Sequence, residues 1–182
     1  MNDYEVLETL ASFRVIVDTR EQATPKAKER YSAMGVPVER GTLDFGDYCG
    51  NITLPSGAAL YDISERIAPR CAIERKMSLD ELAQCFTKGR DRFKREFERA
   101  ARSGAKTYLL IEDGNIEGII NHRYKSRFGS SAFLASLIAW SARYDITPIM
   151  CKSATSGQII REILFRDMKE RLKRGNMDEL GV

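Results

Sequence analysis

The sequence predicts a single α/β domain in which helices flank both faces of a central mixed sheet. Short apolar, β-branched runs alternate along the chain with longer stretches of helical periodicity. A length of 182 residues suits one domain with a sizeable core. We find no repeat, low-complexity tract or proline- and serine-rich linker, so one compact unit is expected.

The elements follow from local signals. FRVIVD (13–18) predicts a buried strand, and residues 25–34 predict a helix with Thr24 as its cap and Gly35 as its end. Further strands are expected within 37–50, where the strand breaks, and at 71–76, 107–113 and 147–152, with a hairpin of NITLP and ALYDIS around Ser56-Gly57. A long helix is expected from the capping box Ser78/Glu81 to about Arg102, with a bend at Gly89. An apolar helix at 130–144 and a helix at 158–173 complete the prediction. This leaves an N-terminal extension at 1–12, a main domain at 13–174 and a flexible tail at 175–182.

Composition excludes several classes of protein. The hydrophobic fraction of 43% and the charged fraction of 30% are those of an ordinary soluble protein. The N-terminus does not resemble a signal peptide, and the longest apolar stretch, 133–140, is too short for a bilayer. We therefore expect a cytoplasmic protein without a membrane partner. Four scattered cysteines and one histidine, His122, argue against a zinc site and a disulfide framework. His122 is expected in a solvated loop.

Acidic side chains gather at or near three strand ends: VDTRE (17–21), FGDY (45–48) and IERK (73–76). Because side chains alternate along a strand, Glu74 and Lys76 share one face, while Arg75 points the other way. Buried charges must be paired or bound to metal, and a divalent cation on that face would explain the spacing. A solvated salt-bridge ladder on an edge strand is the alternative, and spacing alone favours it.

Phosphodiester cleavage requires such a face. Mg²⁺ (or Mn²⁺) prefers oxygen ligands, keeps several waters and activates one of them. Asp47 and Glu74 would be the ligands, with the Arg75 carbonyl as a third. Lys76 would orient the attacking water or stabilise charge on the phosphoryl group.

The residues around these acids resemble a known family. Gly46-Asp47 followed by ERKMSLD (74–80) is similar to the G-D-x(n)-E-R-K-x-x-x-D signature of the XPF-type structure-specific nucleases, within the PD-(D/E)xK, restriction-endonuclease-like superfamily. VDTRE and KGRDRF (88–93) extend the resemblance, which covers roughly residues 14–170. It implies a restriction-endonuclease-like fold for the main domain and a metal-dependent DNA endonuclease.

The resemblance also implies roles for individual residues. Asp47 and Glu74 would be the metal ligands, and Lys76 would be the catalytic lysine. Asp18 and Glu21 would be further acids of the site, with Asp18 near the metal. The supporting residues would be Asp80, Arg20, Arg75 and Arg90. Each has a simpler alternative. VDTRE would be a charged turn, Asp80 would favour the helix dipole, and a helix broken at Gly89 would free Arg90 from its expected inward position.

Two basic segments are candidate DNA contacts. One is a helical stripe, Lys88, Arg92, Arg95 and Arg99, whose alternative is a solvated face paired with Glu96 and Glu98. The other is HRYKSRF (122–128), with Arg123, Lys125 and Arg127 beside two aromatic rings.

The predicted function is cleavage of branched, forked or flapped DNA in repair, recombination or replication. A non-catalytic DNA-binding or scaffold subunit, and a resolvase or restriction-type nuclease on duplex DNA, stay open as alternatives. The family carries a tandem helix-hairpin-helix module that these 182 residues do not contain, which leaves branch preference open. The family also implies a homodimer or heterodimer through this domain. The expected setting is bacterial, archaeal or viral, and nuclear if eukaryotic.

Overall fold

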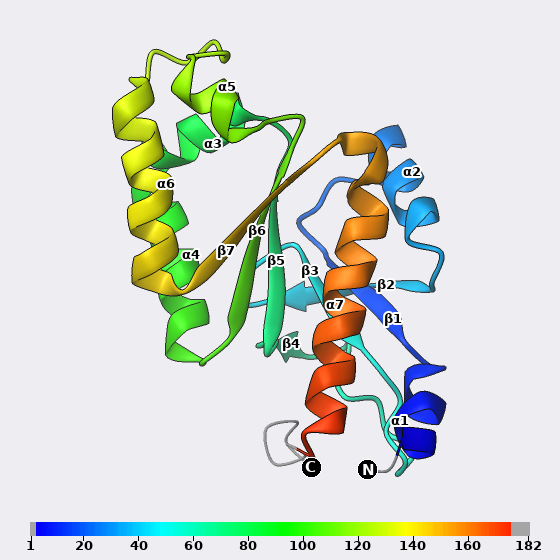
Figure 1. Ribbon diagram of the computed structural model, residues 1–182. Helices are drawn as coiled ribbons and strands as arrows, with labels where there is room; N and C mark the ends of the chain where they lie inside the picture. Colours follow the sequence, from blue (N-terminus) through cyan, green and yellow to red (C-terminus); the bar gives the residue numbers. More distant parts are fainter. Residues whose placement is uncertain (1–2, 176–182) are drawn as a thin grey trace.

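The computed structural model describes residues 3–175, and a seven-stranded mixed sheet forms the centre of this part of the chain (Figure 1). The strands lie in the order β4-β2-β1-β3-β5-β6-β7. Their bounds are β1 (Arg14–Asp18), β2 (Val38–Leu43), β3 (Tyr48–Asn51), β4 (Arg66–Ile67), β5 (Cys71–Lys76), β6 (Lys106–Glu112) and β7 (Ile146–Cys151). β1 and β5 each pair antiparallel with β3, whereas β5, β6 and β7 are parallel. β3 is therefore the antiparallel strand that joins two parallel halves.

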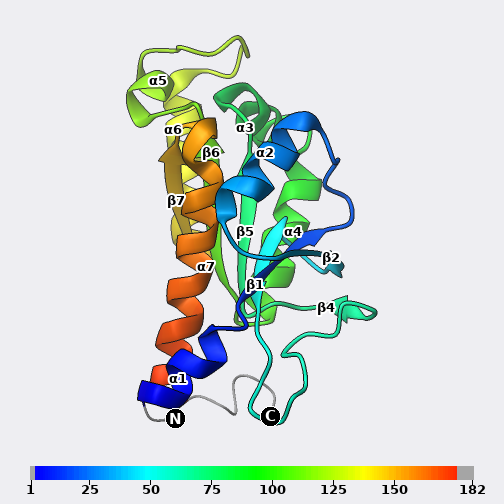
Figure 2. The same cartoon turned by 90° about the vertical axis from the view of Figure 1, so that its right-hand side faces the viewer.

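Helices cover both faces of the sheet (Figure 1). One face carries α3 (Leu79–Phe86), α4 (Arg90–Arg102), α5 (Ile116–Ile120) and α6 (Ser130–Tyr144). The other carries α1 (Asp3–Leu10), α2 (Pro25–Met34) and α7 (Ser156–Lys173), which follows a short 3₁₀ turn, Ser153–Thr155. Figure 2 shows α7 running along its face, with α1 beside its C-terminal end. The predicted α/β architecture is confirmed.

Each face has its own apolar core. On the α7 side, Val15, Val17, Ile73 and Leu110 pack beneath α1, α2 and α7. On the other side, Leu109 and Ile111 lie in a core with aromatic rings of α3, α4 and α6, namely Phe86, Phe93, Phe97, Phe133 and Trp140. The registers Ile73↔Tyr108, Glu74↔Leu109 and Lys76↔Ile111 place Glu74 and Lys76 on the α3/α4 face of β5, and Arg75 on the α2/α7 face. The central strand of the candidate site therefore presents charge to both faces.

Helix α2 is formed as its sequence predicts. The Thr24 hydroxyl accepts a hydrogen bond from the Ala27 N–H at 3.2 Å, and Gly35 ends the helix with a φ of 65°. The strands at 13–18, 71–76, 107–113 and 147–152 and the helix at 130–144 are also present, within a residue or so at each end.

Other elements differ from the prediction. The expected long helix is two helices, because the chain leaves helical geometry between Phe86 and Arg90. The expected hairpin is reduced to the single bridge Thr53↔Ala59. The segment expected as an extension forms α1, whose Val6 and Leu10 join the core, and α5 is a further helix that was not predicted. Residues 176–182 of the predicted tail lie outside the described residues.

No helix within residues 3–175 is long and apolar enough to cross a membrane.

Candidate active site at the end of strand β5

A pocket of about 550 Å³ lies where β5 ends, bordered by α3 and α4. Carboxylates and cations line it in equal measure. The acids are Glu21, Asp47, Glu74, Glu81 and Glu96, and the bases are Arg20, Arg75, Lys76, Lys88 and Arg92. Eight of these ten residues belong to the sites predicted from sequence, so the fold brings together segments that are far apart in the chain.

Asp47 is fixed between β1 and β5 by its backbone. Its N–H donates to the Ile73 carbonyl at 2.8 Å, and its own carbonyl accepts from the Asp18 N–H at 2.9 Å. The preceding Gly46 has a φ of +74°, and a Cβ there would lie 2.9 Å from the Ala72 Cβ, so only glycine fits. The Arg75 N–H donates to the Asp47 carboxylate at 2.7 Å. Gly46 and the backbone bonds of Asp47 thus place one carboxylate at the edge of β5.

The Asp47 carboxyl is crowded by negative charge. Burial raises its pKa well above the ordinary value, and the neighbouring Glu74 carboxylate raises it further, against the opposing effects of Lys76 and the Arg75 N–H. Two carboxylates that share a poorly solvated pocket repel each other when both are ionised. A bound cation would relieve that repulsion.

Glu74 and Lys76 form a buried ion pair on the α3/α4 face, with side chains 6% and 10% exposed. The Lys76 ammonium also lies over the Phe93 ring, 5.1 Å from its centroid. Burial alone would lower the Lys76 pKa, but the Glu74 and Asp47 carboxylates outweigh it and raise that pKa above its ordinary value. The two carboxylates therefore favour the protonated form of Lys76.

The donor set suits a hard cation such as Mg²⁺, because it consists of carboxylate oxygens beside backbone carbonyls. Within residues 3–175, however, no three His, Cys, Asp or Glu side chains converge closely enough to hold a metal ion. A cation at Asp47 and Glu74 would therefore take its other ligands from a carbonyl, water or phosphate, as Mg²⁺ often does. Glu74 would also have to share its carboxylate between the metal and Lys76.

Asp18 and Glu21 lie in different surroundings. The Asp18 carboxylate is 1% exposed and accepts from the Arg20 N–H at 2.8 Å, from the Arg20 guanidinium at 2.6 Å and from the Leu43 N–H at 2.8 Å. It borders the pocket without lining it, and these donors favour the charged-turn alternative. Glu21 lines the pocket and accepts from Arg75 and from the Tyr48 hydroxyl, at 3.0 Å each. Asp18 as a metal ligand stays a prediction.

Asp80 lies away from the pocket, at the start of α3. Its carboxylate accepts from the N–H groups of Lys125 and Ser126, at 2.7 and 2.8 Å. It therefore anchors the basic loop 121–129, in which Arg123, Lys125 and Arg127 are exposed. His122 is also exposed and stacks on Tyr124, as expected for a loop residue.

Arg90 does not point inward as expected. The helix break before it leaves Arg90 exposed, where its guanidinium donates to the Phe86 carbonyl at 3.3 Å and lies 5.3 Å from the Trp140 ring centroid. The expectation was wrong because it assumed one continuous helix from Ser78 to Arg102, which would have placed Arg90 on the apolar stripe.

The predicted basic stripe divides in two. Lys88 and Arg92 line the pocket, whereas Arg95 is exposed elsewhere on α4 and Arg99 donates to the Asp44 carbonyl at 3.0 Å. Glu96, interpreted as a surface partner, is only 13% exposed and faces the pocket. Burial raises the Glu96 pKa, and the nearby Glu74 adds to the rise. Its position three residues after Phe93, on the side of α4 that meets β5, is the signal that could have found it.

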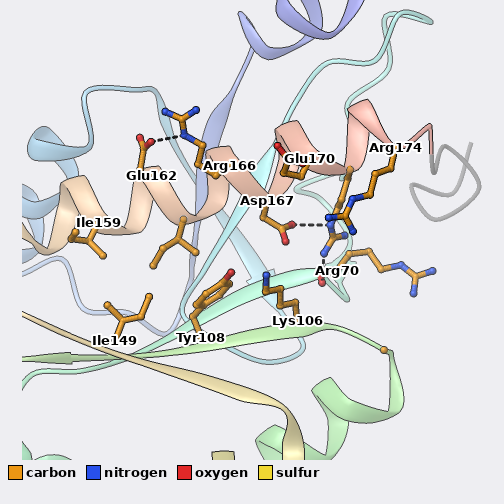
Figure 3. A pocket seen from close by; sticks show the side chains of 13 residues that line it. Arg70, Lys106, Tyr108, Ile149, Ile159, Glu162, Arg166, Asp167, Glu170 and Arg174 are labelled. Carbon is orange, nitrogen blue, oxygen red and sulfur yellow. Dashed lines mark hydrogen bonds and ion pairs between the residues drawn. The ribbon is translucent and has the colours of Figure 1, made fainter. Parts of the chain in front are cut away.

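A larger cavity, about 860 Å³, lies between α7 and the first half of β6, at the opposite end of the sheet (Figure 3). Two of the three acids that line it are paired: Asp167 with Arg171 at 2.7 Å and Glu162 with Arg166 at 2.6 Å. Lys106 and Tyr108 form part of its floor. None of the residues predicted for catalysis lines it, whereas most of them line the smaller pocket.

The fold is shared with two solved structures of XPF. XPF from Aeropyrum pernix has a TM-score of 0.60 and 21% identity, over 90% of this chain and 69% of that one. XPF from the same organism in complex with DNA has a TM-score of 0.59 and 23% identity, over 86% of this chain and 65% of that one. The chain thus has an XPF-like α/β fold and spans about two thirds of those chains. No curated protein sequence matches it.

The family follows from the sequence match. The ERCC4 domain model covers residues 17–163, and the chain belongs to the ERCC4 domain family. The resemblance inferred from the Gly46-Asp47 and ERKMSLD segments is confirmed.

Proposed function

We propose that this chain is a divalent-metal-dependent endonuclease that hydrolyses phosphodiester bonds in DNA. The observation that carries the proposal is the meeting of Asp47, Glu74 and Lys76 in one pocket, with the Asp47 pKa raised by burial and by Glu74. The two neighbouring carboxylates suit a cation, and the buried lysine ammonium beside them suits a phosphate.

Each residue has a distinct task in this proposal. Asp47 and Glu74 would hold Mg²⁺ or Mn²⁺, with the Arg75 carbonyl as a further ligand. When bound, the metal would supply an activated water and offset charge on the scissile phosphate. Lys76, held by Glu74, would donate hydrogen bonds to the water or to a phosphoryl oxygen as negative charge develops. The Asp47 carboxylate is kept in place by the Arg75 N–H.

Several cations are available to hold the DNA backbone. Arg20 is 49% exposed at the pocket, Lys88 lines it from the link between α3 and α4, and Arg92 lines it from α4. Loop 121–129 adds Arg123, Lys125 and Arg127 beside α3, which Asp80 joins to that loop. Phosphate contacts of this kind bind DNA without reading its sequence, so preference for branched, forked or flapped DNA would come from shape. DNA as substrate is supported by the likeness to an XPF solved with DNA.

Cleavage of labelled DNA tests the proposal. Forked, flapped, four-way and linear substrates are incubated with Mg²⁺, Mn²⁺ or EDTA, and wild type is compared with Asp47→Ala. We expect metal-dependent cutting that is lost in Asp47→Ala, by about a hundredfold or more, as for removal of a group that stabilises the transition state. Equal cutting of all four substrates would favour the restriction-type alternative.

A non-catalytic DNA-binding subunit is the second candidate. The observation in its favour is that the Glu74 carboxylate is already paired with Lys76, and that no three metal-ligating side chains converge in the described residues. A folded wild type that binds DNA but cuts no substrate with either metal would select this candidate.

A further inference from the structure

A network of buried charges lies directly behind the pocket, on the α2/α7 face of the sheet. The Arg30 guanidinium contacts the Glu112 carboxylate at 3.0 Å, and Glu112 in turn contacts Arg75 at 3.0 Å. The Arg75 guanidinium donates to the Glu21 carboxylate at 3.0 Å. The Tyr48 hydroxyl accepts from Arg30 at 3.3 Å and donates to Glu21 at 3.0 Å. Two arginines and two glutamates balance each other, with Tyr48 closing the ring.

Nearly all of this network is removed from solvent. The side chains of Arg30 and Glu112 are 6% and 3% exposed, and that of Arg75 is 12% exposed. Arg30 also donates to the Ser156 hydroxyl at 3.2 Å, so the network ties α2 to the start of α7. Only Glu21 and Arg75 line the pocket; Arg30 and Glu112 stand behind them.

Buried ion pairs of this kind add little to stability, because desolvation offsets most of their attraction, and an apolar pair of similar volume would often serve as well. What the network does provide is a fixed orientation for Arg75. Its guanidinium is gripped on both sides, by Glu21 and by Glu112. The same residue's N–H holds the Asp47 carboxylate at 2.7 Å. Arg75 and Glu21 both line the pocket beside Asp47, so a network that holds these two side chains fixes the charges around the Asp47 carboxylate.

We propose that Arg30 and Glu112 are positioning residues that set the divalent-metal affinity of the pocket through Arg75, although neither contacts the pocket. This inference rests on the proposed function, since it concerns the same metal. Carboxylate ligands are commonly held by such outer partners, and loss of a partner typically weakens metal affinity or activity about 10- to 100-fold. Arg30 suits the role because its planar fork grips both oxygens of Glu112.

The test compares the double variant Arg30→Met/Glu112→Gln with Arg14→Met/Glu39→Gln. The control pair, Arg14 and Glu39, meets at the same distance of 3.0 Å, is partly buried and lies at the other end of β1. The first readout uses Mg²⁺ alone, as the rise in melting temperature with Mg²⁺ concentration, which follows metal affinity without requiring cleavage. The second is the Mg²⁺ concentration for half-maximal cleavage, with kcat and KM for DNA measured separately.

We expect the double variant to need about tenfold more Mg²⁺ in both readouts, with KM for DNA unchanged, and the control pair to respond like wild type. Arg30→Lys, which keeps the charge but not the two-point contact, gives an intermediate value. This milder variant also decides the matter if the double variant does not fold.

A lower melting temperature with an unchanged Mg²⁺ response would overturn the proposal, because the network would then be structural only. A wild type that shows no Mg²⁺-dependent shift would contradict both this inference and the proposed function. A wild type that binds Mg²⁺ but cuts no DNA contradicts the proposed function alone, since the Mg²⁺ titration still measures the positioning effect.

Discussion

At the scale of single residues, the ERK segment separates three tasks along one strand. Glu74 and Lys76 face α3 and α4, where they form the ion pair of the pocket. Arg75 faces α2 and α7, where Glu21 and Glu112 hold it. Alternation along β5 was enough to predict this division from sequence. The two partners of Arg75 were beyond prediction, because they come from separate segments that only the fold brings together.

Asp47→Asn should stabilise the metal-free protein at neutral pH. The raised pKa of Asp47 means that folding favours the protonated carboxyl. At neutral pH the ionised carboxylate therefore lowers the free energy of unfolding, and this stability returns as the pH falls through the raised pKa. The amide removes that cost. We expect a higher melting temperature than wild type in EDTA at pH 7, with roughly 2–4 °C for each kcal/mol gained, and no rise on adding Mg²⁺. The difference between the two proteins should shrink at acidic pH; an equally unstable variant in EDTA would contradict the argument.

Lys76→Met should separate metal binding from catalysis. Without the ammonium, Glu74 is left as an uncompensated buried charge, which destabilises the metal-free protein by about 3–5 kcal/mol. Mg²⁺ then takes over the neutralisation, so the Mg²⁺-dependent rise in melting temperature should exceed that of wild type, while cleavage is lost. Calorimetric titration beside Asp47→Asn checks this, and a weaker Mg²⁺ response in Lys76→Met would count against Glu74 as a ligand.

At the scale of elements, Asp80 connects the first turn of α3 to loop 121–129, with its side chain accepting from two consecutive N–H groups of that loop. The loop is ordered internally as well, since the Tyr124 hydroxyl donates to the Phe128 carbonyl at 2.7 Å. Three exposed cations are thereby held in fixed positions next to α3. A preformed arrangement of this kind lowers the entropy lost when a ligand is bound.

Asp80→Ala should weaken DNA binding even though it makes the protein more positive. Ordering a freed loop on DNA costs roughly 1–2 kcal/mol per residue, so we expect about a tenfold loss of affinity. Glu98→Ala is the charge-matched control: it removes one carboxylate from α4, where Glu98 contacts Lys94 at 3.4 Å, and leaves the loop intact. Fluorescence anisotropy in EDTA at one salt concentration compares them. Tighter binding by both variants would mean that net charge, not loop order, governs affinity.

Helices with strong local signals could be predicted, and those without them could not. Thr24 and Gly35 mark both ends of α2 in the sequence, and its bounds are those predicted. α5 spans only Ile116–Ile120, too short for a periodic pattern, and owes its stability to packing against α6. The break between α3 and α4 leaves Arg90 exposed, whereas the prediction of one helix placed it inward.

At the scale of the whole molecule, the sheet separates two cores. Helices α2 and α7 cover the core on their face of the sheet and contact each other closely. Gly157 permits that contact, because a Cβ at this position would lie 2.3 Å from the Arg30 carbonyl oxygen and 3.0 Å from the Ala33 Cβ. The nearest of these atoms belongs to the backbone of α2, so no side-chain rotation could make room for a Cβ. The geometry behind the pocket thus depends on a glycine in a different helix.

Gly157→Ala should therefore destabilise the fold and disturb the pocket together. Overpacking of this kind costs about 1–3 kcal/mol, measured by urea unfolding. Displacement of α2 moves Arg30, so the Mg²⁺ response should weaken as well. Gly129→Ala serves as control, since a Cβ there meets nothing within 4 Å. A Gly157→Ala protein of wild-type stability would show that α2 adjusts freely.

The neutrality of the network behind the pocket also has a consequence for how this sequence can vary. Arg30 and Glu112 lie 82 residues apart in the chain yet form one ion pair, so a lineage that loses one of them alone keeps an unmatched charge in the interior. Changes at the two positions should therefore be inherited together as an uncharged pair, because exchanging the two residues would place a second arginine against Arg75. Arg75 and Glu21 are not free to follow, because both also face the pocket.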